Sequence, residues 1–261
     1  MRLHRRTLLI TGGTSGIGLE LARQLAASGN TVVITGRDPG RLDAALAQLP
    51  GVHGVVSDVS DPAAIAALHD EVLARFPDLD VLVNNAGIMR NLDLTRARPL
   101  ADVTREIDVN LGGPLRMVQQ FLPHLRTRGE AAIVNVSSGL AFVPLAISPV
   151  YSAAKAALHA YTRALRVQLA GSGVTVFELA PPPVETPLMH GEFEAELKGS
   201  TGMSVEALAR QAIAGIERGR LEIRPGLANV LKAMSRLAPE FMFRQMNRMM
   251  TPATARRRLP A

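Results

Sequence analysis

Short runs of β-branched and aliphatic residues alternate along the chain with longer amphipathic or alanine-rich segments, and this alternation restricts the possible folds most strongly. A strand, a helix and a second strand in this order form a unit whose two strands are parallel. The predicted strands are Thr7–Thr11, Thr31–Thr35, Gly54–Ser57, Val81–Asn84, Ala131–Val136 and Val174–Leu179, with a weaker seventh at Leu221–Arg224. We therefore predict an α/β fold with a doubly wound parallel sheet and helices on both faces.

The intervening segments carry helix signals. The predicted helices are Ile17–Ser28, Pro39–Leu49, Pro62–Arg75, Leu100–Arg126 in two pieces, and Tyr151–Leu169. Proline is accepted in the first turn of a helix, which suits Pro39 and Pro62, and Asp61 is a good N-cap. No repeat and no linker divides the chain, so we expect a single domain.

Composition sets further limits. Hydrophobic residues make up 47% and charged residues 20% of the 261 residues, which is enough for a large core. The absence of cysteine excludes disulfides, thiolate metal sites and cysteine nucleophiles, and it favours a reducing compartment, so we expect a cytoplasmic protein. The apolar run Leu8–Ile10 is too short for a signal peptide, and prolines interrupt Leu140–Val150, so no membrane span is predicted.

The net charge of +6 comes entirely from the end of the chain. Residues 230–261 contain seven basic residues and one acidic residue, whereas acidic and basic residues balance over 1–229. A neutral body with a basic tail argues against nucleic-acid binding. We predict a catalytic domain over 1–229, with a substrate loop at 181–202 resembling a mobile lid, and a basic, Met-rich extension of that domain over 230–261.

A glycine-rich turn lies directly between the first predicted strand and the first predicted helix. It reads Thr11-Gly12-Gly13-Thr14-Ser15-Gly16-Ile17-Gly18. Glycines allow a tight turn and close approach of the backbone to a pyrophosphate, whose charge faces the helix N-terminus. The turn therefore predicts a nucleotide site, while the missing Gly-Lys-Ser/Thr excludes a P-loop.

Tyr151 and Lys155 are four residues apart and share a helix face. Lowering the pKa of a tyrosine from its usual ~10 to about 7 requires roughly 4 kcal/mol. One cation at ~4 Å contributes about that much, so the pair can serve as acid and base. Ser138 follows a strand end, where its hydroxyl can hydrogen-bond a substrate oxygen, and Ser137 is its competitor.

The chain resembles the short-chain dehydrogenase/reductase family, and more narrowly its DltE-like oxidoreductase branch. The motifs that carry the resemblance are the TGxxxGxG turn from Thr11, Asn84-Asn85-Ala86-Gly87, Asn110, Ser138, and Tyr151-Ser152-Ala153-Ala154-Lys155. Where many members have Pro-Gly after the sixth strand, this chain has Pro181-Pro182-Pro183. The resemblance implies a Rossmann-type fold, and a homodimer or homotetramer formed through the long helices.

The resemblance also implies a reaction: hydride transfer between a nicotinamide and a carbonyl or secondary-alcohol carbon. Tyr151 would exchange the proton, Lys155 would lower its pKa and hold ribose hydroxyls, Ser138 would polarise the substrate oxygen, and Asn110 would support a proton relay. No metal is required. The expected cofactor-binding residues are Gly12, Thr14, Ser15, Gly16, Ile17, Gly18, Arg37, Asp58, Val59, Asn84, Ala86, Gly87, Tyr151, Lys155, Val184 and Thr186.

Cofactor choice depends on the residues that follow the second strand. Arg37 can pair with a 2′-phosphate and Ser15 can add a hydrogen bond, so NADP(H) is predicted. Asp38 follows directly and keeps NAD(H) as an alternative. His159 is interpreted as a packing or surface residue. Two other functions remain open: a non-catalytic NAD(P)-sensing protein, which usually has a broken Ser-Tyr-Lys set, and a sugar-nucleotide epimerase, which carries a larger C-terminal domain.

A small-molecule carbonyl or alcohol is the expected substrate. The candidate residues for an apolar substrate pocket are Met89, Leu140, Phe142, Leu145, Ile147, Leu188 and Met189. The extension has apolar residues at helical spacing over Val230–Ala238, and beyond Pro239 methionines and phenylalanines alternate with Arg244 and Arg248. We expect it to dock on its own domain, with a partner subunit or an anionic membrane surface as alternatives.

Overall fold

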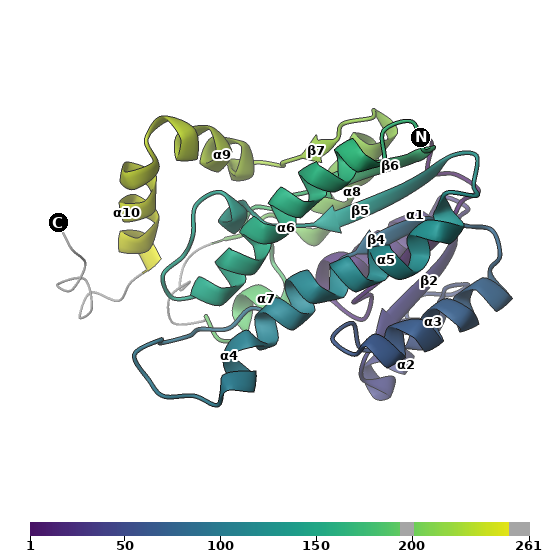
Figure 1. The fold of residues 1–261 in the computed structure, drawn as a ribbon, viewed down its shortest axis with the longest axis horizontal. Helices are drawn as coiled ribbons and strands as arrows, with labels where there is room; N and C mark the ends of the chain where they lie inside the picture. Colours follow the sequence, from purple (N-terminus) through teal and green to yellow (C-terminus); the bar gives the residue numbers. More distant parts are fainter. Residues whose placement is uncertain (194–200, 251–261) are drawn as a thin grey trace.

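The computed structural model describes residues 1–193 and 201–250 and contains one parallel sheet in the order β3-β2-β1-β4-β5-β6-β7 (Figure 1). The strands are β1 (Thr7–Ile10), β2 (Thr31–Gly36), β3 (His53–Val56), β4 (Leu79–Asn84), β5 (Ala131–Val136), β6 (Val174–Leu179) and β7 (Glu222–Ile223). Every predicted strand is present, and those at 131–136 and 174–179 have the predicted bounds. The doubly wound fold class is confirmed.

Helices connect these strands. They are α1 (Gly16–Ala27), α2 (Pro39–Leu46), α3 (Pro62–Arg75), α4 (Leu100–Ile107), α5 (Gly113–Leu125), α6 (Pro149–Gln168), α7 (Pro187–His190), α8 (Val205–Glu217), α9 (Leu227–Leu237) and α10 (Pro239–Met250). Asp61 caps α3 as predicted, because its side chain accepts a hydrogen bond from the Ala63 N–H. Helix α8, whose first turn is capped by Ser204, was not predicted from the sequence.

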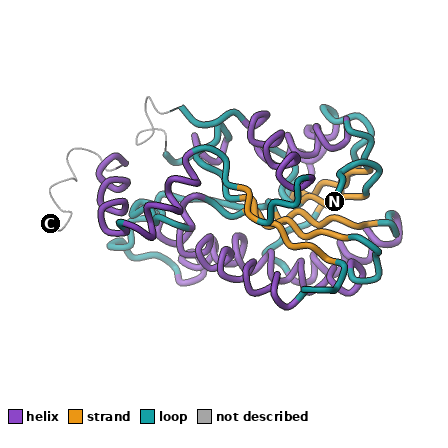
Figure 2. The backbone as a smooth tube through the Cα atoms, turned by 90° about the horizontal axis from the view of Figure 1, so that it is seen from above, coloured by secondary structure: helices purple, strands orange, loops and turns teal. Residues whose placement is uncertain are grey.

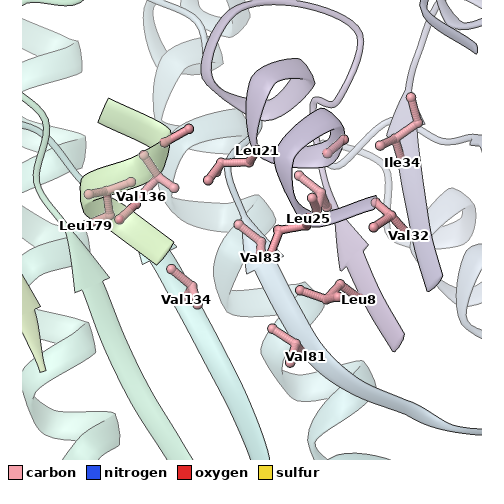
Figure 3. Close-up of a cluster of buried hydrophobic side chains, with 14 of the residues drawn as sticks. Leu8, Leu21, Leu25, Val32, Ile34, Val81, Val83, Val134, Val136 and Leu179 are labelled. Atoms are coloured by element: carbon pink, nitrogen blue, oxygen red, sulfur yellow. The ribbon is translucent and has the colours of Figure 1, made fainter. Parts of the chain in front are cut away.

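The sheet lies between two layers of helices, each packed on its own apolar core (Figure 2). Successive side chains of a strand point to opposite faces, so Leu8 and Ile10 enter one core while Leu9 enters the other. Figure 3 shows the first core, in which Leu21 and Leu25 of α1 lie against the strands. Both faces of the central strands are therefore dry, which explains their almost uninterrupted apolar sequences.

Two loops meet where the strand order reverses. The chain runs outward from β1 through β2 to β3, and then returns to pair β4 on the other side of β1. At such a switch point the loops beyond the carboxyl ends of adjacent strands separate and leave a crevice. The glycine turn after β1 and the Asn85–Gly87 segment after β4 border this crevice.

The last part of the chain packs against the segment that follows β5. Helices α9 and α10 contact each other, and Met246 of α10 packs on Val143 and Leu145. In the predicted substrate loop, Val184 forms a bridge with Met203 and α7 begins after Thr186. Residues 194–200 of that loop and the predicted terminus Arg256–Arg258 lie outside the described residues. Within the described parts, no helix combines the length and apolarity needed to cross a membrane.

Candidate active site

A cavity of about 560 Å³ opens beyond the carboxyl ends of the strands. Most of the predicted site residues line it. They are Gly12, Thr14, Ser15, Gly16, Ile17, Arg37, Asp58, Val59, Ala86, Gly87, Ser138, Tyr151, Lys155, Val184 and Thr186. The cavity thus joins residues from the first strand turn to the loop after β6.

The glycine turn is closed tightly against neighbouring backbone. A Cβ on Gly12 would lie 2.7 Å from the Cα of Ala86, and the φ of Gly12 is +65°. Gly16 also has a positive φ, and a Cβ there would lie 3.1 Å from the methyl of Thr186. The Ser15 side chain makes no capping hydrogen bond within α1, so the N–H groups of the first turn of α1 face the cavity without a side-chain cap. This geometry suits an anionic group such as a pyrophosphate.

Two predicted cofactor residues lie behind the cavity wall rather than in it. A Cβ on Gly18 would lie 2.4 Å from the Gly12 carbonyl oxygen, so Gly18 allows α1 to pack on the turn. Asn84 is 2% exposed and its Nδ2 donates to Asn135 Oδ1 over 2.9 Å. Both residues support the turn and the β4 strand end, and neither lines the cavity.

Asn110 is fully buried in a π-helical turn, Asp108–Gly112, between α4 and α5. Its Nδ2 donates to the Ile88 carbonyl over 2.8 Å, and its Oδ1 accepts from the Ile88 N–H over 3.2 Å. A Cβ on Gly87 would lie 2.7 Å from Asn110 Oδ1 and 3.7 Å from Lys155 Nζ. Because Gly87 has no side chain, the Asn110 amide and the Lys155 ammonium can both lie close to its Cα.

Tyr151 and Ser138 both line the cavity, and Ser138 acts to lower the pKa of the Tyr151 phenol. The neighbouring Ser137, which competed with Ser138 in the sequence, instead donates from Oγ to Glu178 Oε1 over 2.5 Å. Ser138 is in extended backbone and begins a short 3₁₀ turn, and its Oγ accepts from the Leu140 N–H. Of the two serines, Ser138 is the one that acts on the pKa of Tyr151.

Burial dominates the titration of the Tyr151/Lys155 pair. Burial raises the pKa of Tyr151 to about 12, against the lowering effect of Ser138, and the negative charge of Glu106 adds to the rise. Burial also lowers the pKa of Lys155 to about 8. The Lys155 Nζ donates to the Val136 carbonyl over 2.8 Å and lies 5.6 Å from the centre of the Tyr151 ring. From the sequence, Lys155 was expected to lower the pKa of Tyr151, but burial of the phenol raises this pKa by more.

Two arginines that follow β2 also line the cavity. Arg37 and Arg41 both line the cavity, and the sequence analysis missed Arg41. Asp38 uses Oδ1 to accept the Arg41 N–H over 2.8 Å, which caps α2. Although burial acts to raise it, hydrogen bonds from Ser60 hold the pKa of Asp58 below its ordinary value.

The third part of the cavity wall is apolar. Of the predicted pocket residues, Met89, Leu140, Leu145, Ile147, Leu188 and Met189 line it, while Phe142 does not. Further apolar lining residues were missed, among them Phe193, Leu231 and Met246. Leu231 and Met246 are on α9 and α10, and no local pattern marks which residues of an amphipathic helix reach a distant cavity.

Comparison with known proteins shows the family of the chain. The family described as short chain dehydrogenase matches residues 6–197. The oxidoreductase DltE of Bacillus subtilis (strain 168) is 42% identical over 248 residues, which cover 95% of this chain and 98% of DltE.

Two solved structures share the fold over 97% of this chain. A short-chain dehydrogenase from Burkholderia cenocepacia in complex with NADP has a TM-score of 0.81 and 26% identity, with 100% of its chain covered. A short-chain dehydrogenase/reductase from Burkholderia phymatum in complex with NAD has a TM-score of 0.83 and 26% identity, with 98% covered.

A glycine turn lies at the switch point of a doubly wound sheet, and a buried tyrosine and lysine on α6 line the same cavity. Together these features define a Rossmann-type oxidoreductase. The chain belongs to the short-chain dehydrogenase/reductase family, in the branch of the DltE oxidoreductase.

Proposed function

We propose that this enzyme transfers a hydride between the nicotinamide of NADP(H) and a carbonyl or secondary-alcohol carbon. The observation that carries the proposal is that Ser138, Tyr151 and Lys155 line the same cavity as the uncapped N-terminus of α1. The glycine turn and the 560 Å³ volume suit a dinucleotide with a small substrate. When bound, the nicotinamide supplies the two electrons as a hydride.

In the reductive direction, the residues supply the proton and hold the oxygen. The Ser138 hydroxyl hydrogen-bonds the carbonyl oxygen, and the Tyr151 hydroxyl donates its proton to that oxygen as the carbon gains the hydride. The C=O bond thereby becomes a C–OH group. A positive charge bound beside the phenol opposes the rise of its pKa. In the oxidative direction, deprotonated Tyr151 takes the alcohol proton.

Lys155 and Asn110 complete the proton path. The lowered pKa of Lys155, about 8, means that its ammonium group can release a proton near neutral pH. Asn110 lies beside it across Gly87, with its amide fixed on both sides by Ile88. We assign Lys155 to proton supply and ribose binding, and Asn110 to holding the relay in place.

The preference for NADP(H) over NAD(H) is also part of the proposal. Arg37 and Arg41 both border the cavity next to Thr14 and Ser15. Two guanidinium groups can bind a 2′-phosphate through charge-assisted hydrogen bonds. One carboxylate oxygen of Asp38 accepts a hydrogen bond from the α2 backbone. Because this oxygen is already bonded, we propose that Asp38 does not bind the ribose hydroxyls in a way that favours NAD(H).

The proposal can be tested by assaying the purified protein with NADPH and with NADH against a panel of aldehydes, ketones and quinones. We expect substrate-dependent oxidation of NADPH at 340 nm (the usual absorbance band of the reduced nicotinamide) that the Tyr151→Phe variant does not show. Tight NADPH binding without turnover of any carbonyl would favour the sensing function instead.

Assembly and location complete the proposal. The outer face of α6 carries exposed small residues, among them Ala153, Ala156 and Ala160. Small residues let two such helices approach closely, so we propose a homodimer or homotetramer formed through the long helices. We also propose a cytoplasmic location, on the basis of the cysteine-free composition. Light scattering and cell fractionation test these two points.

A further inference from the structure

The cavity separates its charged lining from its apolar lining. Among the described residues, the charged side chains that line it are Arg37, Asp38, Arg41, Asp58 and Lys155. The first four follow β2 and β3, and the Lys155 ammonium is bonded to the Val136 carbonyl. The described wall beyond Ser138 and Tyr151 therefore offers no charged group to a substrate.

The C-terminal arm, which we define as α9 and α10, contributes part of the wall beyond the catalytic residues. A Cβ on Gly139, next to Ser138, would lie 3.1 Å from Leu231 Cδ1, so this leucine packs directly over the serine loop. Met246 is 9% exposed and packs with Leu145 while lining the cavity. The arm thus adds two apolar side chains at the substrate end.

Specific polar contacts hold the C-terminal arm in this position. Asn247 is 1% exposed, accepts the Ala146 N–H at Oδ1 over 2.6 Å, and donates to the Pro144 carbonyl over 3.2 Å. Lys232 forms an ion pair with Glu222 and lies 5.3 Å from the centre of the Phe142 ring. These contacts fix the arm to the 139–147 segment, so Met246 and Leu231 are held in place at the cavity wall.

We propose that the substrate is an uncharged carbonyl compound with an apolar body, and that the C-terminal arm selects it by excluding anionic groups. This inference rests on the proposed carbonyl reduction. An anion brought against this wall loses its hydration and gains no cation from the described lining residues. An apolar body gains burial against Leu140, Leu145 and Met246.

A matched pair of ketones tests the selection. Cyclohexanone and 4-oxocyclohexanecarboxylate differ by one carboxylate, and we expect kcat/KM for the neutral ketone to be at least ~100-fold higher. Met246→Lys places a cation at the wall and should reduce this ratio by at least ~10-fold. Gln245→Lys is the control, because it adds the same charge at an exposed neighbouring position of α10.

The outcomes separate this inference from the proposed function. Equal kcat/KM for the two ketones, or equal shifts of the ratio in Met246→Lys and Gln245→Lys, would overturn the inference. Calorimetric binding of the same ketones to the complex with NADP+ measures the preference without turnover. Binding that prefers the neutral ketone, without turnover of any carbonyl, contradicts the reaction alone. Equal or absent binding of both contradicts the selection.

A second, independent observation concerns a buried carboxylate beneath the catalytic serine. Glu178, on β6, is 1% exposed, accepts a hydrogen bond from Ser137 Oγ, and lies 2.8 Å from His159 Nδ1 at its Oε2. Ser137 stands between Val136, whose carbonyl accepts the Lys155 ammonium, and Ser138. Glu178 thus connects the β5 strand end to α6 at the level of both catalytic groups.

We also infer that Glu178 is a positioning residue of the active site, acting through Ser137 and His159. The carboxylate fixes the strand end that carries Ser138 and the helix that carries Tyr151 and Lys155. His159 is on the same helix, one turn beyond Lys155, so its bond to Glu178 sets the rotation and depth of α6 at the reacting end. This gives His159 a role that the sequence interpretation did not assign.

Variants of Glu178 distinguish positioning from general stability. Glu178→Leu removes both hydrogen bonds, and we expect kcat to fall at least ~10-fold with KM for the cofactor within ~2-fold. Glu178→Gln can still bond both partners and should recover most of kcat. Ser137→Ala, which removes one hydroxyl, should lower kcat by ~3-fold or more, and it keeps the test valid if Glu178→Leu does not fold.

Arg166→Leu is the matched control for this second inference. Arg166 also connects α6 to β6, because its Nε donates to the Val176 carbonyl over 3.0 Å, but it does so at the far end of the helix. We expect Arg166→Leu to lower the melting temperature and leave kcat within ~2-fold. A kcat in Glu178→Leu and Ser137→Ala that stays at the parental value, or no recovery in Glu178→Gln, would overturn the positioning role.

Discussion

The two sides of the cavity are built in different ways. The cofactor side comes from short loops directly after β1, β2 and β4, and its turn is fixed by close backbone contacts such as Gly12 against Ala86. The substrate side comes from segments far apart in the chain, among them the 139–147 loop and the C-terminal arm. Side-chain packing and the two bonds of Asn247 hold it together.

The two sides should therefore differ in how well they tolerate substitutions. A backbone cradle tolerates little change, because an added Cβ at Gly12 has nowhere to go. An apolar wall made of Leu231 and Met246 accepts other side chains of similar volume at small cost. The same cofactor chemistry can therefore be combined with a different substrate wall, and the following predictions test that division.

The largest effect is expected at the junction of the two sides. Tyr151→Phe keeps the ring but removes the proton donor, so kcat should fall by ~10²-fold or more while the cofactor Kd stays within a few-fold. Steady-state kinetics and a fluorescence titration with NADPH measure the two quantities. Near-parental turnover in this variant would remove Tyr151 from the reaction.

A smaller effect is expected on the cofactor side. Arg37→Ala should lower kcat/KM for NADPH by ~10- to 100-fold, because a charge-assisted pair with the 2′-phosphate is lost. The value for NADH should change by less than ~3-fold. If NADH and NADPH are used equally by the parent and by Arg37→Ala, the preference for NADP(H) is wrong.

On the substrate side, deletion of residues 230–261 should act on stability rather than on membrane binding. Loss of the packing of Met246 and of the bonds of Asn247 should cost about 3 kcal/mol. The melting temperature should then fall by roughly 5–10 °C, or the oligomer should become smaller. An unchanged melting temperature and mass, together with lost sedimentation on anionic vesicles, would reverse this order.

The smallest effect is a pH dependence that comes from Lys155. Its pKa is about 8 in the folded chain and 10.5 as the ordinary value, so between these values the unfolded chain binds more protons and stability rises with pH. From pH 7.5 to 9.5 the rise should reach about 2 kcal/mol. Lys155→Met should lack it. Chemical denaturation of the parent and of Lys155→Met at several pH values from 7.5 to 9.5 measures the difference.

The same comparison explains how far the sequence could be interpreted. The glycine turn, Tyr151 and Lys155 are encoded by local spacing, because one turn or one helix face fixes their geometry. Arg41 and Met246 were not found, since their positions depend on how α2 and α10 pack. The titration of Tyr151 was argued in the opposite direction because burial cannot be read from a spacing of four residues.

The π-helical turn at Asp108–Gly112 has a consequence for changes in chain length. A π turn contains one more residue than an α turn, and each residue of an α-helix rotates the chain by ~100°. Removing one residue there would rotate α5 relative to α4. Asn110 could then still face Ile88, or Met117 and Phe121 of α5 could stay in the core, but not both. The π turn therefore fixes how far α5 is rotated about its axis relative to α4. This segment should therefore accept substitutions more readily than any one-residue insertion or deletion.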